Sequence, residues 1–223
     1  MIRSGQVDVN GTIRRDPETP VRVEHDRIAV NGRLVEPQAK IYLLMNKPRG
    51  AVATASDEKG RETVYSVLAS SRADLPAWIA PVGRLDKASE GLLLLTNDSE
   101  WGARIAAPET HLEKTYHVQI ATVADEGFLS ALVRGVRDEG REVLRAKRAR
   151  LLRSGQKNCW LEIVLDEGKN RQIRRMMDVV GVETLRLIRI AIGPLQLGKL
   201  AKGEFRPLTA EEKRFLDQAT SHA

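Results

Sequence analysis

The sequence predicts an α+β protein with a central sheet that is mixed or largely antiparallel and flanked by helices. Most apolar residues occur in short alternating runs bounded by Gly, Pro, Asn or Asp, which is typical of strands. The few segments with helical spacing lie irregularly between these runs, without the regular strand–helix alternation of a parallel sheet. These two observations together favour a strand-dominated core with helices on its faces.

The composition describes a globular chain that can bury a sizeable core. The 223 residues are 42% hydrophobic and 30% charged, enough for one large domain or a small module beside a larger one. No apolar run approaches the ~20 residues of a membrane helix, and the first residues lack the apolar core of a signal peptide. A single cysteine, Cys159, excludes an internal disulfide. We therefore expect a cytoplasmic protein with no membrane contact.

Positive charge is concentrated in two stretches, residues 134–153 and residues 169–175, within a net charge of +6. Such local density suits a phosphate backbone, because each neutralised phosphate releases counterions. Aromatic residues make up only 4% of the chain, so stacking platforms for single strands are scarce. The composition favours structured or locally opened RNA as an anionic partner.

Residues 5–32 have the pattern of a small β module. Alternating valines precede Asn10-Gly11, and a second alternating run precedes Asn31-Gly32; both pairs are strong signals for tight turns. The stretch Gly5–Gly11, followed by a strand near Ile28, resembles the C-terminal half of an S4 RNA-binding domain, without the two helices that open that domain. We expect a partial S4-like module over residues 1–35, a linker over 33–40 and a larger domain over 41–223.

The larger domain shows strand and helix patterns in an irregular order. Strands are expected at 41–46, 92–95, 116–120, 161–165 and 185–192, with basic strands within 141–153. Helices are expected at 63–70, 99–107, 125–134, 171–180 and 209–219.

Residues 81–99 are the segment around which the rest of the chain is expected to be organised. A polar loop carrying Asp86 leads into Gly91 and then four consecutive leucines, which predict a buried strand. Asp86 therefore lies on a loop at the edge of a sheet centre, where rigid structure can hold a reactive side chain. Spacing alone leaves two interpretations open: Asp86 is a reactive carboxylate, or it only caps the turn before the strand.

The predicted helix 171–180, with Asn170 as its N-cap and Gly181 as its stop, is unusual in its charges. Three arginines near its start oppose the helix dipole, at a cost of a few tenths of a kcal/mol each when exposed. An anion or a carboxylate from elsewhere would offset that cost, although a solvated basic face is the alternative. Arg174 is better placed than Arg84 for a two-point contact that keeps Asp86 ionised, and Tyr116 would place a phenol beside them.

Other chemistries have weaker support in the sequence. The four histidines and Cys159 lack paired spacing, so no metal site is expected. No glycine-rich phosphate loop with a following Lys-Ser or Lys-Thr occurs. Asp86 and Glu90 form a possible carboxylate pair for a hydrolase, but at four residues apart in a loop they are more simply turn and surface groups.

Several stretches occur in a specific order along residues 41–210. They are Asn46-Lys47-Pro48-Arg49-Gly50, Gly83–Asp86 with Ser89–Asn97, Glu113–Tyr116, Glu167–Met176 and the tail Gly203–Leu208. In this order they resemble the motifs of the RsuA/RluB/RluE/RluF group of ribosomal RNA pseudouridine synthases.

The resemblance implies a pseudouridine synthase fold and a cofactor-free isomerase that turns a uridine of RNA into pseudouridine. Asp86 would be the essential carboxylate, acting on the ribose by a covalent or a glycal route. Tyr116 would lie near the base and help to remove the C5 proton, and Arg174 would pair with Asp86. The cations expected to contact RNA are Arg84, Lys47, Lys114, Lys169, Arg171 and Arg175.

The partner expected from the resemblance is ribosomal RNA or a ribosomal assembly intermediate, bound by a monomeric enzyme. The motif Asn-Arg-Gln-Ile-Arg-Arg is closer to large-subunit enzymes than to small-subunit ones, which tend to carry Lys at the position of Arg174, so 23S rRNA is favoured over 16S rRNA. The target should lie in unpaired RNA, where base flipping costs least. A non-catalytic rRNA-binding or ribosome-assembly protein is the alternative.

Overall fold

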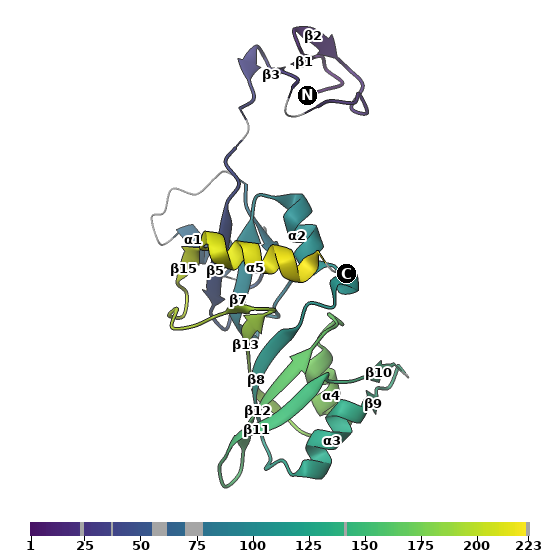
Figure 1. Ribbon diagram of the computed structural model, residues 1–223, viewed down its shortest axis with the longest axis vertical. Helices are drawn as coiled ribbons and strands as arrows, with labels where there is room; N and C mark the ends of the chain where they lie inside the picture. The colour runs from purple at the N-terminus through teal and green to yellow at the C-terminus, as the bar shows by residue number, and fades with distance from the viewer. Residues whose placement is uncertain (23–24, 37, 55–61, 70–77, 141, 222–223) are drawn as a thin grey trace. The chain divides into compact units, whose positions relative to one another are not determined.

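The computed structural model describes residues 1–22, 25–36, 38–54, 62–69, 78–140 and 142–221. The chain divides into two compact units, unit 1 (Met1–Ala39) and unit 2 (Lys40–Ala223). Figure 1 shows the strands and helices of each unit. In the described residues, no helix has the length and apolar character needed to cross a membrane.

Unit 1 is a four-stranded antiparallel sheet in the order β2-β1-β3-β4. Its strands are β1 (Val7–Val9), β2 (Thr12–Arg14), β3 (Ile28–Val30) and β4 (Arg33–Leu34). Both predicted tight turns are present, since Asn10 and Asn31 adopt positive φ angles of 53° and 52° before a glycine. The expected linker is wrong at its start, because β4 occupies its first two residues. The S4-like character of this unit stays a prediction.

Charge is distributed unevenly between the two units. Residues 1–39 contain six arginines and six Asp or Glu residues, so unit 1 is neutral and the net charge of +6 belongs to unit 2. The electrostatic attraction of the chain for a polyanion therefore originates in unit 2.

Unit 2 is built on a nine-stranded sheet in the order β11-β12-β8-β13-β7-β5-β15, with β14 beside β13 and β6 beside β7. Every strand pair in this sheet is antiparallel except β13 with β7. The predicted α+β class with a mixed, largely antiparallel sheet is confirmed. The strands are β5 (Tyr42–Lys47), β6 (Ala80–Val82), β7 (Glu90–Thr96), β8 (Lys114–Ile120), β11 (Arg148–Ser154), β12 (Cys159–Leu165), β13 (Thr184–Ile192), β14 (Leu195–Gln196) and β15 (Phe205–Pro207).

The helices of unit 2 lie close to their predicted positions. They are α1 (Val64–Ala69), α2 (Ser99–Ala106), α3 (Glu126–Arg134), α4 (Gln172–Val179) and α5 (Ala210–Thr220), with a short 3₁₀ turn η1 (Pro108–Thr110) and a hairpin of β9 (Val136–Arg137) and β10 (Val143–Leu144). Asp98 caps α2 by accepting from the Trp101 amide, and the predicted start of this helix at residue 99 is confirmed. The N-cap predicted for α4 is wrong: Arg171, in a left-handed conformation, takes that position in place of Asn170.

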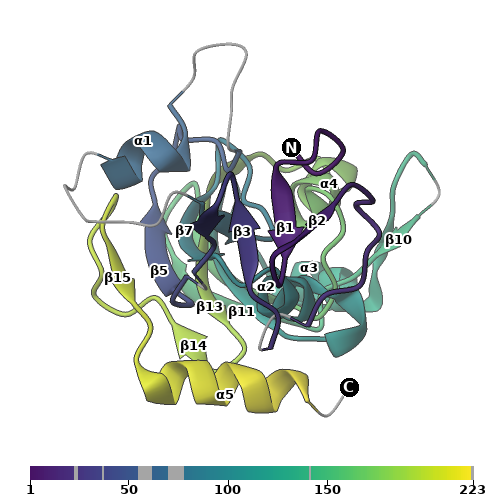
Figure 2. The same ribbon diagram turned by 90° about the horizontal axis from the view of Figure 1, so that it is seen from above.

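The four leucines of β7 divide between two cores on opposite faces of the sheet. Leu93 and Leu95 pack in the core that includes α1, and Leu92 and Leu94 pack in the core that includes α2 and α5. Figure 2 shows α1 and α5 on opposite sides of β5. Because β7 is covered on both faces, it has a continuous apolar sequence rather than an alternating one.

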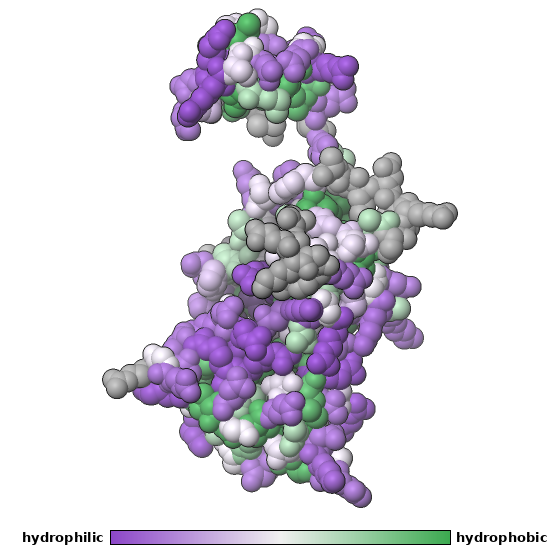
Figure 3. All heavy atoms as spheres, turned by 180° about the vertical axis from the view of Figure 1, so that it is seen from behind, coloured by the Kyte–Doolittle hydropathy of each residue, from purple (hydrophilic) through white to green (hydrophobic). Residues whose placement is uncertain are grey.

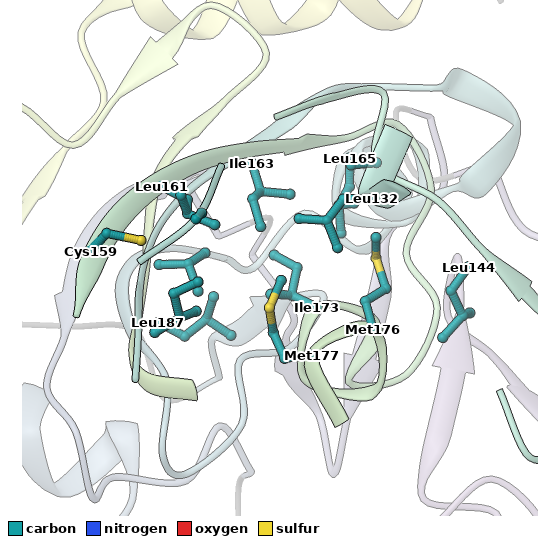
Figure 4. Close-up of a cluster of buried hydrophobic side chains, with 14 residues drawn as sticks. Leu132, Leu144, Cys159, Leu161, Ile163, Leu165, Ile173, Met176, Met177 and Leu187 are labelled. Atoms are coloured by element: carbon teal, nitrogen blue, oxygen red, sulfur yellow. The ribbon is translucent and has the colours of Figure 1, made fainter. Parts of the chain in front are cut away.

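A third core covers the half of the sheet formed by β8, β11, β12 and β13. Leu161, Ile163 and Leu165 on β12 face Ile173, Met176 and Met177 on α4 (Figure 4). The apolar stripe of α4 is therefore buried, as its helical spacing predicts.

The two halves of the sheet meet where β7 runs parallel to β13, over two residue pairs, Ile188 with Glu90 and Arg189 with Gly91. Gly91 has a φ of +101°, and a Cβ atom there would lie 2.3 Å from the Arg189 carbonyl oxygen. A glycine at this position lets the strands approach each other. We call this place, Glu90–Gly91 against Ile188–Arg189, the parallel joint.

Candidate active site

A pocket of about 190 Å³ opens beside the parallel joint and contains most of the residues predicted to carry the chemistry. It is lined by the Asp86 loop, by β8 and β13, and by the segment that leads into α4. Among its lining residues are Asp86, Tyr116, Arg84, Lys114, Lys169 and Arg171. Segments far apart in the sequence thus meet at one place in the fold.

Asp86 lies on the loop between β6 and β7, with a side chain that is 25% exposed. Its Oδ2 atom is 3.6 Å from Nη1 of Arg171, whose side chain is 49% exposed. This contact corrects the prediction that Arg174 would be the ion-pair partner of Asp86. The physical reason is that Arg171 is the left-handed N-cap of α4, outside the helix, whereas the guanidinium of Arg174 binds the Ala88 and Thr184 carbonyls.

Arg174 holds the backbone of the same loop. Its Nη2 atom donates to the Ala88 carbonyl at 3.1 Å, and its Nη1 atom donates to the Thr184 carbonyl at 3.4 Å. Burial and the nearby Arg171 lower the pKa of Arg174, while Asp86 acts in the opposite direction. Arg174 therefore orders the loop and adds positive potential near Asp86.

Lys47 was expected to contact RNA, and this expectation is wrong. The residue is 0% exposed, and its Nζ atom donates to the Ser89 carbonyl at 2.8 Å and to the Pro48 carbonyl at 3.0 Å. Burial lowers the pKa of Lys47 from 10.5 to about 8, although Asp86 and Glu90 act to raise it. Because Ser89 is the last residue of the Asp86 loop, the hydrogen bond from Lys47 holds the end of that loop, and Lys47 is not available to bind a phosphate.

Tyr116 and Lys114 lie on the same face of β8, two residues apart. Tyr116 is half-buried, lines the pocket and packs against two of the three cores. Burial lowers the pKa of the half-buried Lys114, and Arg189 lowers it further. The predicted meeting of Tyr116 with Asp86 in one pocket is thus present in the structure.

The remaining cations differ in how free they are to meet a phosphate. Arg84 is exposed at the pocket, whereas Lys169 pairs with Glu167 at 2.9 Å. Arg175 pairs with Asp138 and Glu142 of the β9–β10 hairpin, so its charge is matched within the protein, and its contact with RNA stays a prediction. Carboxylates from elsewhere therefore offset the charge of Arg171 and Arg175 at the start of α4, as the dipole argument predicts.

Glu90 is buried and does not line the pocket. Arg186 donates two hydrogen bonds of 3.0 Å to it, and Lys202 lies at 2.7 Å. Burial raises the pKa of Glu90, but the hydrogen bonds from these two cations outweigh that effect and leave it lowered. The carboxylate-pair hydrolase is unsupported, because Glu90 stays ionised and points away from the pocket chemistry.

Three buried polar atoms at the pocket were missed by sequence reasoning. Among the described residues, Ser89 Oγ, Gln172 Oε1 and Arg189 Nη2 have no hydrogen-bond partner, and all three residues line the pocket. Such atoms are rare in folded proteins and commonly mark functional sites. In the sequence, these atoms could have been anticipated only from Arg189, a cation inside the otherwise apolar run Leu187–Ile192 of β13.

The described residues contain no group of three His, Cys, Asp or Glu side chains that could hold a metal ion.

On the face of the molecule shown in Figure 3, hydrophilic residues gather across the middle of unit 2. The pocket combines two partly exposed carboxylates, Asp86 and Glu167, with a phenol and several cations, which suits acid–base or nucleophilic chemistry on a polyanion.

Comparisons with known proteins agree on one family. The profile of the family described as RNA pseudouridylate synthase matches residues 41–178. Ribosomal large subunit pseudouridine synthase B from Bacillus subtilis is 36% identical over 225 residues, covering 100% of this chain and 89% of the relative. An uncharacterized RNA pseudouridine synthase from Aquifex aeolicus is 36% identical, covering 95% and 84%. A crystal structure of a pseudouridylate synthase superposes with a TM-score of 0.70 at 32% identity, covering 96% of this chain and 90% of that one.

Proposed function

The chain belongs to the RNA pseudouridylate synthase family, and on this premise we propose that it isomerises a specific uridine of ribosomal RNA to pseudouridine. The observation that carries the proposal is the meeting of Asp86 and Tyr116 in one pocket, with Arg171 at 3.6 Å from the carboxylate. Two of the described acidic side chains line this pocket, Asp86 and Glu167. Glu167 pairs with Lys169 at 2.9 Å, and Asp86 lies on the loop between β6 and β7.

Asp86 is the essential carboxylate in this proposal. It acts on the ribose while the bond between C1′ and N1 of the uridine breaks, either by bonding to C1′ or by removing a proton at C2′. Arg171 lies 3.6 Å from the Asp86 carboxylate and orients it by its charge. Arg174 and Lys47 position the loop through the Ala88 and Ser89 carbonyls, so that the carboxylate is held rigidly.

Tyr116 acts on the base side. Its ring borders the pocket opposite the Asp86 loop, where it stacks near the base, and its phenol helps to remove the C5 proton after the base has turned. The isomerisation needs no redox step, because one C–N bond is exchanged for one C–C bond within the same nucleotide. This agrees with the expectation of a cofactor-free enzyme.

RNA is bound by the cations around the pocket mouth. Arg84 and Arg171 are exposed there and are suited to the phosphates that flank a flipped nucleotide. The charges of Lys169 and Arg175 are matched within the protein. We expect the target uridine in a loop or disrupted helix, where flipping costs a few kcal/mol or less.

Within ribosomal RNA we propose the 23S molecule, free or within an assembly intermediate, as the substrate of a cytoplasmic monomer. The support is the name of the Bacillus subtilis relative, which assigns that protein to the large subunit, together with Arg174 in the motif that spans the start of α4.

The test is mapping of pseudouridine in ribosomal RNA from a deletion strain that carries the wild-type gene or a variant. The wild type should restore one pseudouridine, and Asp86→Asn should restore none. Asp125→Asn is the matched control, because Asn also serves as the N-cap of α3. Full restoration by Asp86→Asn would exclude the assigned role. Purified wild-type protein that binds ribosomal RNA but releases no tritium from C5-labelled uridine would favour the non-catalytic alternative.

A further inference from the structure

Two cations that line the pocket, the buried Arg189 and the half-buried Lys114, have no anionic partner among the described residues. Arg189 is 5% exposed, and its Nε atom donates to the Leu92 carbonyl at 2.8 Å, while Nη2 has no partner among the described residues. Lys114 makes no hydrogen bond or ion pair through its ammonium within the described part of the chain, although Asp166 exerts an attractive field on it. We call Lys114 and Arg189 the cation pair.

The backbone brings both cations to the face of the sheet that carries Tyr116. Arg189 lies directly opposite Tyr116 in the β13–β8 ladder, and Lys114 lies opposite Ile192. A register irregularity between Arg189 and Ala191 places both Arg189 and Ile192 at the pocket, although an unbroken strand would turn them to opposite faces. Arg189 shares the pocket face with Leu187 by ordinary strand alternation, and the irregularity adds Ile192, the residue opposite Lys114, to the same face.

Holding a buried guanidinium and a half-buried ammonium side by side without an anion costs free energy, which points to a function for them. Removing a charge from water is favourable only when an opposite charge meets it. The carboxylates that line the pocket are already paired, Asp86 with Arg171 and Glu167 with Lys169. The missing anion must therefore come from the bound nucleotide.

The part of a flipped nucleotide that reaches this depth is the base rather than a phosphate. The phosphates remain joined to the RNA chain and meet the exposed cations at the mouth, whereas the flat base enters the pocket. A neutral uracil has no charge to offer, but the base becomes an anion during the proposed reaction. When the C1′–N1 bond breaks, its electron pair leaves with the base and spreads over N1, O2 and O4.

We propose that Lys114 and Arg189 stabilise the uracil anion formed when the glycosidic bond breaks. This inference rests on the proposed function. The charge exists on either route, whether Asp86 bonds to C1′ or takes the C2′ proton. It disappears again when C5 bonds to C1′, the C5 proton is lost and N1 is protonated. Donors aimed at charge that develops only during the reaction accelerate the chemical step rather than binding.

Removal of the Lys114 charge should separate activity from stability. Lys114→Met relieves the burial of an ammonium beside Arg189, so the melting temperature should stay the same or rise. The single-turnover rate on a synthetic RNA fragment containing the mapped uridine should fall about 100-fold, with little change in the Kd for that RNA. Lys114→Arg should retain most of the rate, and Lys157→Met, at an exposed position outside the pocket, should match the wild type.

A second substrate distinguishes stabilisation of the leaving base from any structural role. The same fragment with 5-fluorouridine at the target carries a better leaving group, since fluorine stabilises the base anion. Measured by loss of the target nucleoside from nuclease digests, the defect of Lys114→Met should be about tenfold smaller on this fragment.

Equal defects on both fragments would overturn the inference, and so would a defect confined to the Kd, which would indicate a phosphate contact. Failure of the proposed function looks different: the wild type itself would form no pseudouridine in any ribosomal RNA.

Discussion

Replacement of Lys47 by methionine should change how the stability of unit 2 depends on pH. The folded protein holds this ammonium at 0% exposure, and burial lowers its pKa from 10.5 to about 8. Below pH 8 the lysine is protonated in both the folded and the unfolded chain, so the folded state bears the full cost of the buried charge. Between pH 8 and 10.5 the unfolded chain binds more protons, and the free energy of unfolding rises with pH.

The size of this rise follows from the pKa of Lys47. One pKa unit corresponds to about 1.4 kcal/mol, so complete deprotonation is worth about 3 kcal/mol. Lys47→Met removes that contribution and leaves the Ser89 and Pro48 carbonyls without their donor, at a cost of about 1–3 kcal/mol each. The variant should therefore be close to the wild type or moderately less stable at pH 7, and should fall behind it by a further ~3 kcal/mol by pH 10.

Urea denaturation followed by tryptophan fluorescence measures this difference. All three tryptophans, Trp78, Trp101 and Trp160, belong to unit 2, so the signal reports on that unit alone. Other groups that titrate at high pH contribute equally to both proteins and cancel in the comparison. A free-energy difference between wild type and variant that stays constant from pH 7 to 10 would refute the reasoning.

Three further predictions concern the parallel joint, the buried ion pair and the pocket mouth. Gly91→Ala should destabilise unit 2 by about 3 kcal/mol or more, because its Cβ would meet the Arg189 carbonyl oxygen at 2.3 Å with φ at +101°; in the same urea titration Gly168→Ala, which has nothing within 4 Å, should be nearly neutral. Glu90→Gln should lower the free energy of unfolding by about 3 kcal/mol at pH 7, because it leaves two cations unpaired. The wild type should lose stability as the pH falls through the lowered pKa of this carboxyl, and the variant should not. The same loss of unfolding free energy with falling pH in both proteins would contradict this. Arg84→Ala should reduce the slope of log Kd for RNA against log salt by about one, and an unchanged slope in filter-binding titrations would remove Arg84 from the RNA interface.

Much of the fold was predictable because its local signals agree with its final packing. The alternating runs, the Asn-Gly turns and the Asp98 cap each act over a few residues, and the tertiary structure keeps them all. The four leucines of β7 are informative in the same way, since only a strand covered on both faces needs such a run.

The site was less predictable, since it depends on contacts between distant residues. Lys47 in an Asn-Lys-Pro-Arg-Gly sequence reads as a surface cation, and its burial follows only from the strands that pack around β5. Arg171 rather than Arg174 contacts Asp86 because Arg171 is the left-handed N-cap of α4 and Arg174 binds the Ala88 and Thr184 carbonyls, neither of which is visible in the sequence. The role of Arg189 becomes visible only once the pairing of β13 with β8 places it opposite Tyr116.

The parallel joint also has a consequence for the folding of the protein during its synthesis on the ribosome. When translation has passed Asn97, the nascent chain contains the Asp86 loop and β7, but β13 lies about ninety residues ahead. A parallel pairing of this kind cannot form until the later strand emerges, so the carboxylate exists for a time without Tyr116, Arg171 or Arg189. The incomplete chain is therefore inactive while it is close to the ribosomal RNA that we propose as its substrate. Activity begins only when synthesis has passed Ile192.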